Sequence, residues 1–102
     1  MALSKHKVLA AAGTIVSPGT TLAQLQDAGS VQVLVTTDQN VRFTVDGLTD
    51  PVITGGAEVG ILLTSSDSVL LTAEEFVNSK WLDVSTDARI QFAFLSAVRE
   101  RS

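Results

Sequence analysis

The sequence predicts an all-β domain: an antiparallel β-sandwich or jelly roll of about seven to eight short strands with one short helix. In several short stretches apolar residues alternate with polar ones, which is the period of a half-buried strand. Gly, Pro, Asn, Asp and Ser separate these stretches at spacings near ten residues. A length of 102 residues suits one domain with a modest core. We expect residues 1–102 to form that domain, with residues 1–6 as a flexible arm.

The alternation is clearest over residues 31–45. Residues 31–36 and 41–45 each place Val or Phe on one face, and four polar residues lie between the two stretches. This pattern predicts two strands joined as a hairpin. Leu34 falls on the opposite face of the first strand, which predicts that this second side is partly covered. Asp46 and Gly47 then form a turn, because Gly adopts positive φ freely and Asp bonds its own backbone.

The residues before this pair of strands are less regular. Residues 8–16 are small and apolar, with Val and Ile that favour a strand. Ser-Pro-Gly at residues 17–19 is a turn, because Pro fixes φ and Gly allows the reversal. Residues 20–28 fit a short helix and an irregular edge segment equally well.

The C-terminal half predicts four further strands and the helix. Thr72 and Glu75 have the spacing of a capping box, so a helix begins there and ends near residues 78–79. Trp81 is expected to be buried, as the largest side chain of the chain. The four strands occupy residues 60–64, 68–71, 80–84 and 88–98.

Composition and charge argue against several classes of function. The net charge is −4 and the seven basic residues are scattered, whereas binding to phosphate groups needs clustered Lys and Arg. No nucleic acid partner is therefore expected. The chain has no Cys, which excludes thiolate metal sites and a Cys nucleophile. It has no run of 18 apolar residues, so no membrane-spanning helix is expected.

The polar residues do not form a pattern typical of catalysis. His6 is the only His, whereas a general base needs a positioned partner and a zinc site needs three or four ligands. Asp46 and Asp50 lack the alternating oxygen ligands of a calcium loop, and Asp46 is better explained as a turn former. We therefore expect no catalytic residue, cofactor, metal or small-molecule substrate, and no enzyme activity.

One segment resembles a known class of proteins. Residues 41–51 read V-x-F-x-V-D-G-x-T-x-P, and Gly56 and four apolar stretches follow, at residues 61–63, 69–76, 81–84 and 90–94. In this order, over about residues 30–95, the chain resembles small β-sandwich structural proteins of tailed bacteriophage virions, of the capsid cement or decoration type. The first 29 residues do not contribute to this resemblance.

The resemblance implies a protein of the virion, made in the host cytoplasm and bound to the outer capsid surface. Its partners would be neighbouring major capsid subunits, which it stabilises, and copies of itself in a trimer or dimer. An accessory protein of the neck or tail is an alternative that the sequence does not separate from cement. A carbohydrate- or receptor-binding module is a further alternative, but it needs exposed aromatic rings, and here the apolar faces are expected to take them.

Three segments are candidates for contact with such partners. They are the N-terminal arm, the loop at residues 48–53 and the C-terminal end, each of which the sequence pattern leaves exposed. The candidate contact residues are Leu3, Lys5, Lys7, Val8, Leu48, Pro51, Val52, Ile53, Arg99 and Arg101.

Overall fold

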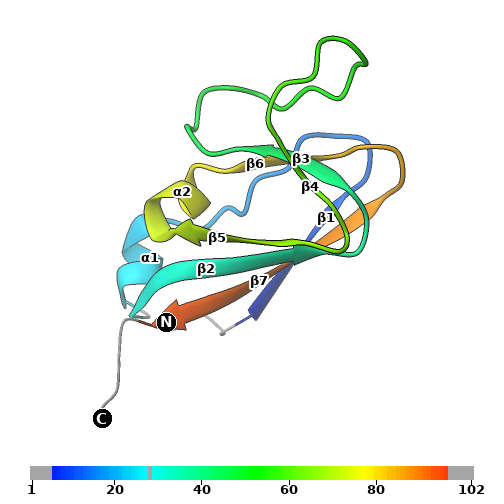
Figure 1. The fold of residues 1–102 in the computed structure, drawn as a ribbon. Coiled ribbons are helices and arrows are strands. Elements are labelled where there is room, and N and C mark those ends of the chain that lie inside the picture. The colour runs from blue at the N-terminus through cyan, green and yellow to red at the C-terminus, as the bar shows by residue number, and fades with distance from the viewer. Residues whose placement is uncertain (1–5, 28, 97–102) are drawn as a thin grey trace.

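The computed structural model describes residues 6–27 and 29–96, which form two antiparallel sheets packed face to face (Figure 1). The four-stranded sheet has the order β1-β7-β2-β5 and comprises β1 (His6–Ala11), β2 (Ser30–Thr37), β5 (Ser68–Thr72) and β7 (Ala88–Ser96). The three-stranded sheet has the order β4-β3-β6 and comprises β3 (Val41–Thr44), β4 (Ile61–Leu63) and β6 (Lys80–Asp83). The predicted antiparallel sandwich is confirmed, and the jelly-roll topology stays a prediction.

The first two clear strands of the sequence do not form a hairpin. β2 pairs with β5 and β7, whereas β3 pairs with β4 and β6 in the other sheet. The polar residues between them make a corner that bonds to other parts of the chain. Asp38 Oδ1 accepts from Arg89 N at 2.8 Å, and Asn40 Oδ1 accepts from Ser65 N at 3.1 Å. The hairpin prediction was wrong because these side chains bond to distant backbone rather than closing a local turn.

Helix α2 (Ala73–Val77) begins where its capping box predicts. Thr72 Oγ1 accepts from Glu75 N at 3.1 Å, and Glu75 Oε1 accepts from Thr72 N at 2.9 Å. These two bonds satisfy backbone donors that the first turn leaves without a partner inside the helix.

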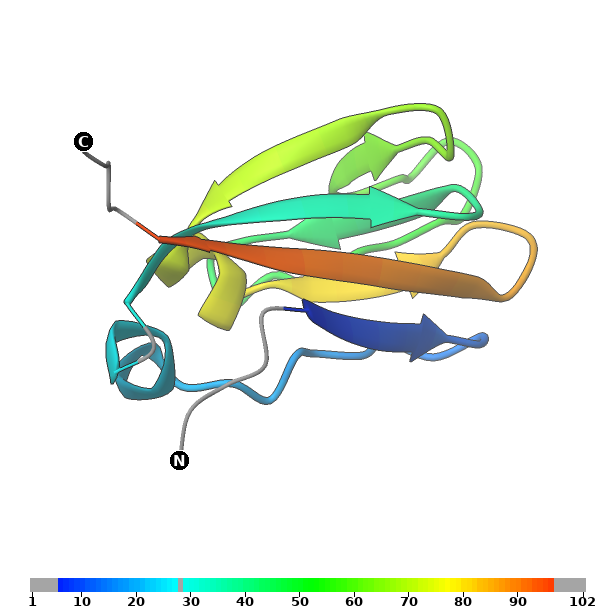
Figure 2. The ribbon, with the colours of Figure 1, turned by 90° about the horizontal axis from the view of Figure 1, so that it is seen from below.

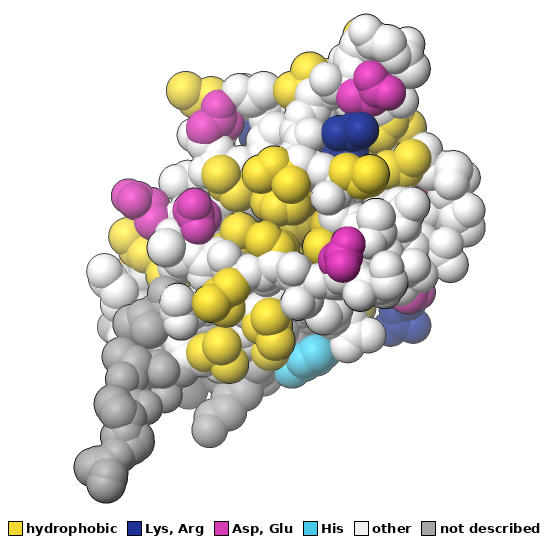
Figure 3. Space-filling model, viewed as in Figure 1, with side chains coloured by type: hydrophobic (Ala, Val, Ile, Leu, Met, Phe, Trp, Pro, Cys, Tyr) yellow, Lys and Arg dark blue, Asp and Glu magenta, His cyan; other side chains and the backbone are white. Residues whose placement is uncertain are grey.

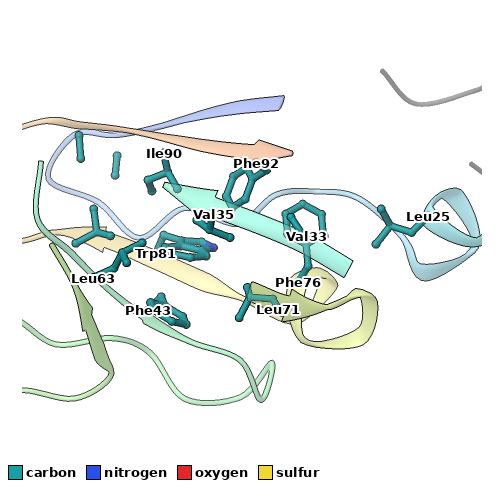
Figure 4. Close-up of a cluster of buried hydrophobic side chains, with 13 residues drawn as sticks. Leu25, Val33, Val35, Phe43, Leu63, Leu71, Phe76, Trp81, Ile90 and Phe92 are labelled. Carbon is teal, nitrogen blue, oxygen red and sulfur yellow. The ribbon is translucent and has the colours of Figure 1, made fainter. Parts of the chain in front are cut away.

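A second helix, α1 (Leu22–Asp27), decides between the two alternatives for residues 20–28. It begins with a similar box: Thr21 Oγ1 accepts from Gln24 N at 3.2 Å, and Gln24 Oε1 accepts from Thr21 N at 2.8 Å. The described residues therefore contain two short helices rather than the one predicted. Leu25 of α1 is fully buried and extends the core at that end of the sandwich (Figure 4).

The five aromatic side chains of the protein form one continuous series between the sheets, in the order Phe43, Trp81, Phe92, Phe76, Phe94. The Trp81 ring stacks on Phe43 of β3 at 4.5 Å between centroids and meets Phe92 of β7 edge-on at 5.5 Å. It thus contacts both sheets (Figure 4). Trp81 is fully buried, as predicted, and its Nε1 donates to Ser79 Oγ at 2.8 Å.

The N-terminal strand is shorter than predicted. His6 is the first residue of β1, so it belongs to a strand rather than to an arm. β1 ends at Ala11, after which Gly13 turns with a φ of +83° and its N–H donates to Asp83 Oδ1 at 2.7 Å. Val16 then pairs with Trp81 through backbone bonds of 2.9 and 2.8 Å. These contacts close the side of the sandwich formed by β1 and β6.

Candidate interaction surfaces

The 46–60 loop projects beyond β3 and β4 (Figure 1), and its first turn is organised by Asp46. Asp46 Oδ1 accepts from the backbone N–H groups of Leu48 and Thr49 at 2.9 and 2.8 Å. Its Oδ2 accepts from Thr49 Oγ1 at 2.5 Å. The Thr49 hydroxyl, followed by the two backbone amides, lowers the pKa of Asp46 to about 2, because these bonds favour the ionised carboxyl. Asp46 is a turn former, as predicted.

This turn displays the Leu48 side chain. Leu48 is 86% exposed, and the next most exposed large hydrophobic side chain that the structure describes, Ile61, is 57% exposed. A single exposed Leu is ordinary on a protein surface. Here, however, two backbone N–H groups and the Thr49 hydroxyl donate to Asp46 and fix the turn, so a partner would bind Leu48 with little loss of backbone entropy.

The second part of the loop is attached to the body of the protein. Thr44 Oγ1 donates to the Thr49 carbonyl oxygen at 2.6 Å, and Lys80 Nζ pairs with Asp50 Oδ1 at 2.8 Å. Pro51 is fully buried. Its side chain lies in the interior, so Pro51, a predicted contact residue, is not exposed to a partner.

The tip of the loop is a small hairpin. Val52 and Val59 exchange two backbone hydrogen bonds of 3.0 and 2.9 Å. Ile53 and Val59 are 38% and 37% exposed, whereas Val52 is half-buried. The loop returns through Gly60, which has a φ of +108° and approaches β3 so closely that a Cβ would lie 2.9 Å from the Phe43 carbonyl oxygen.

The charges near the exposed apolar side chains of this loop are mainly negative. Asp46, Asp50 and Glu58 lie on the loop, and Asp50 is paired with Lys80. The loop therefore presents apolar side chains with an acidic rim. A complementary partner would have an apolar pocket with basic groups around it.

Lys7 and Val8, the remaining predicted contact residues that the structure describes, are not brought together with the loop. Lys7 is half-buried on the inner side of β1, whereas Val8 is 41% exposed on the outer side of the four-stranded sheet. The 46–60 loop lies on the other side of the sandwich, beyond the three-stranded sheet (Figure 1). Leu3, Lys5, Arg99 and Arg101 lie outside the described residues.

The outer face of the four-stranded sheet is a second apolar surface, which sequence reasoning did not identify as a contact site. Its register places Leu34 of β2 between Ala93 of β7 and Leu70 of β5. No described element crosses this face (Figure 2), so among residues 6–27 and 29–96 none gives the cover predicted for the side bearing Leu34. We call it the outer sheet face and define it by Val8, Gln32, Leu34, Thr36, Leu70, Gln91, Ala93 and Leu95.

Within residues 6–27 and 29–96, no group of three or more His, Asp or Glu side chains is placed to hold a metal ion. His6 lies beside the outer sheet face, with Nε2 3.0 Å from Gln91 Oε1. Neither described helix is long and apolar enough to cross a membrane. No protein-family model, curated protein or solved structure matches this chain.

Proposed function

We propose that this protein is a structural protein of a phage virion, a capsid cement protein that binds and stabilises neighbouring major capsid subunits. The proposal combines the sequence resemblance with one structural observation. That observation is the 46–60 loop, which displays Leu48 on a fixed turn within an acidic rim. The copies would lie on the outer capsid surface, after synthesis in the host cytoplasm.

In the proposed mechanism, each copy buries a small apolar contact on the capsid, and this contact is repeated at many equivalent sites. Burial of one Leu side chain contributes about 1.5–3 kcal/mol, which is modest for a single copy. On a symmetric shell many copies bind equivalent sites, and contacts between neighbouring copies raise the effective concentration of each. The carboxylates around Leu48 would favour a capsid site with Lys or Arg at its border.

The carbohydrate-binding alternative receives no support from the aromatic side chains. All five of them belong to the series between the sheets, and four are fully or almost fully buried. A sugar platform needs an aromatic face open to solvent. Phe94, the fifth, is half-buried against Phe76.

The test is binding of the purified chain to particles of the phage that encodes it, compared with the Leu48→Ala variant. We expect hundreds of copies per particle for the wild type, and an apparent affinity about tenfold or more weaker for the variant, because the lost burial is worth about 1.5–3 kcal/mol. Ile15→Ala is the matched control, since Ile15 is 41% exposed but belongs to another segment, next to the bridge between Val16 and Trp81. A dozen copies or fewer would contradict the cement function in favour of a neck or tail protein.

A further inference from the structure

We propose that the outer sheet face is the surface through which two copies of this chain associate, face to face, about a two-fold axis near Leu34. The proposed function supplies the setting in which copies meet, and so this inference rests on it for its biological role. The contact itself depends on the charge, apolar content and area of this face, which are properties of the isolated chain.

The charge distribution favours a second copy as the partner. None of the four strands of this sheet contains Asp or Glu, so all eleven acidic residues of the chain lie outside them. The chain as a whole carries a net charge of −4. When identical faces meet, a carboxylate on the face would come close to carboxylates of the second copy, and like charges repel. This face lets two acidic chains meet without that cost.

The three-stranded sheet shows the contrast. Its outward-facing side chains include Arg42 of β3 and Lys80 of β6. Arg42 Nη1 donates to the Gly60 carbonyl oxygen at 2.9 Å, and Lys80 pairs with Asp50 at 2.8 Å. The cationic side chains of that outer face are thus engaged with the 46–60 loop and its carboxylate Asp50. The four-stranded sheet also has a cation on its outward side, Arg89 near the start of β7, so what distinguishes its outer face is the absence of carboxylates.

The apolar content of the outer sheet face is high for a surface that no described element covers. Leu34, Leu70, Leu95 and Val8 are 36%, 48%, 38% and 41% exposed. Leu34 and Leu70 are directly opposite each other on neighbouring strands, so they form one continuous apolar area. In the side view of Figure 3, hydrophobic side chains lie beside the His side chain at the lower edge of the molecule, with no acidic side chain among them. Depletion of charge is the compositional signature of an interface core.

The area of the outer sheet face limits the expected strength of self-association. Four strands about 4.8 Å apart, over about five residues of about 3.4 Å each, cover roughly 300–400 Å². A stable dimer buries about 800 Å² per partner. We therefore expect a weak dimer, with a Kd between about 10 µM and about 1 mM. Contacts of this strength become occupied when copies are concentrated on one assembly.

Sedimentation equilibrium of the full chain, from about 10 µM to about 2 mM, tests the proposal directly. The wild-type mass is expected to rise with concentration toward that of two chains. Leu34→Glu and Leu70→Glu should each raise the Kd at least about tenfold, because each introduces a carboxylate that the contact between two copies would have to desolvate. Leu62→Glu is the matched control: Leu62 is 44% exposed on the outer face of the other sheet and should leave the Kd within about twofold. Thermal unfolding of each variant verifies that it folds.

Three results would overturn the proposal. One is a wild-type chain that stays monomeric at the highest concentration. Another is an equal loss of association in Leu62→Glu. The third is a Leu34→Glu variant that associates like the wild type but no longer attaches to particles, since the capsid rather than a second copy would then occupy the face. Because the masses are measured without particles, a failure here is distinguishable from a failure of the cement function, which the copy number decides.

Discussion

The 46–60 loop and the outer sheet face are both exposed and partly apolar, but they are built in different ways. The loop is narrow, bordered by carboxylates, and held by hydrogen bonds that the Asp46 carboxylate accepts and that Thr44 and Lys80 donate. The outer sheet face is broad, free of carboxylates, and held by the strand ladder itself. The loop offers a partner one fixed side chain, Leu48, whereas the outer sheet face offers a wide, partly apolar contact area.

Because of this difference, the two surfaces are suited to recognise different partners. A projecting Leu on a fixed turn needs a pocket on the partner, so it selects a different protein that provides one. A flat sheet face without carboxylates can pack on another such face, which an identical copy provides. Substitutions that act on one surface and spare the other test this division.

The largest effect is expected from Trp81→Ala, which should impair binding through both surfaces because it destabilises the whole domain. Trp81 contacts Phe43 in one sheet and Phe92 in the other, and it is fully buried. Its truncation should cost about 3–5 kcal/mol of unfolding free energy, a large part of the stability of a small domain. Denaturant unfolding measures this loss, and both surfaces should fail together.

The control for this prediction is Leu82→Ala on the same strand. Leu82 is half-buried and faces the outer side of the three-stranded sheet, opposite Arg42. Its truncation should cost less than about 1.5 kcal/mol, since it leaves the space between the sheets filled. If Trp81→Ala cost no more than Leu82→Ala, the two sheets would not depend on one shared core.

A smaller and more local effect is expected from Gly60→Ala. Gly60 has a φ of +108°, and an added Cβ would lie 2.9 Å from the Phe43 carbonyl oxygen. Both the conformation and the contact are unfavourable for Ala, at about 1–3 kcal/mol. Binding to particles through Leu48 should weaken as the loop shifts, whereas the Kd for self-association should stay within about twofold of wild type.

Gly55→Ala is the matched control for Gly60→Ala, because nothing lies within 4 Å of an added Cβ at Gly55. Its unfolding free energy should stay within about 0.5 kcal/mol of wild type. Equal destabilisation by the two substitutions would show that the close approach of Gly60 to β3 does not stabilise the loop. A parallel loss of self-association in Gly60→Ala would show that the two surfaces are coupled.

Sequence patterns predicted the sandwich because its strands alternate cleanly and its turns contain the residues that turns require. The capping box at Thr72 was identified for the same reason, since both partners lie within four residues. The equivalent pair Thr21 and Gln24 was available to the same reasoning and would have favoured the helix over the edge segment. Local interactions are visible in a sequence when both partners lie close along the chain.

Long-range interactions were not visible in this way. The corner between β2 and β3 depends on bonds from Asp38 to Arg89 and from Asn40 to Ser65, whose partners lie 51 and 25 residues away. A run of four polar residues is therefore equally compatible with a hairpin turn and with a connection that crosses from one sheet to the other. The burial of Pro51 and the exposure of the outer face around Leu34 were not predicted for the same reason, because both depend on which strands pair.

The smallest effect is expected from Asp46→Asn, and it should depend on pH. The hydrogen bonds from Thr49 and Leu48 lower the pKa of Asp46 from 3.8 to about 2 in the folded protein. A carboxyl whose pKa is lowered on folding adds stability above its unfolded pKa of about 4, and that stability is lost as the pH falls toward about 2. The wild type should therefore be more stable than Asp46→Asn at pH 7, and the gap should close between about pH 4 and about pH 2.

Denaturant unfolding at several pH values measures this gap, and Asp87→Asn, in an exposed turn before β7, controls for the change in net charge. Faster amide exchange at Leu48 and Thr49 in Asp46→Asn should accompany it, because their N–H groups donate to the Asp46 carboxylate. Self-association should be unaffected, since Asp46 is on the loop side of the sandwich. A gap that persisted unchanged at pH 2, or amide exchange as slow as in wild type, would mean that the ionised carboxylate does not hold Leu48 in place.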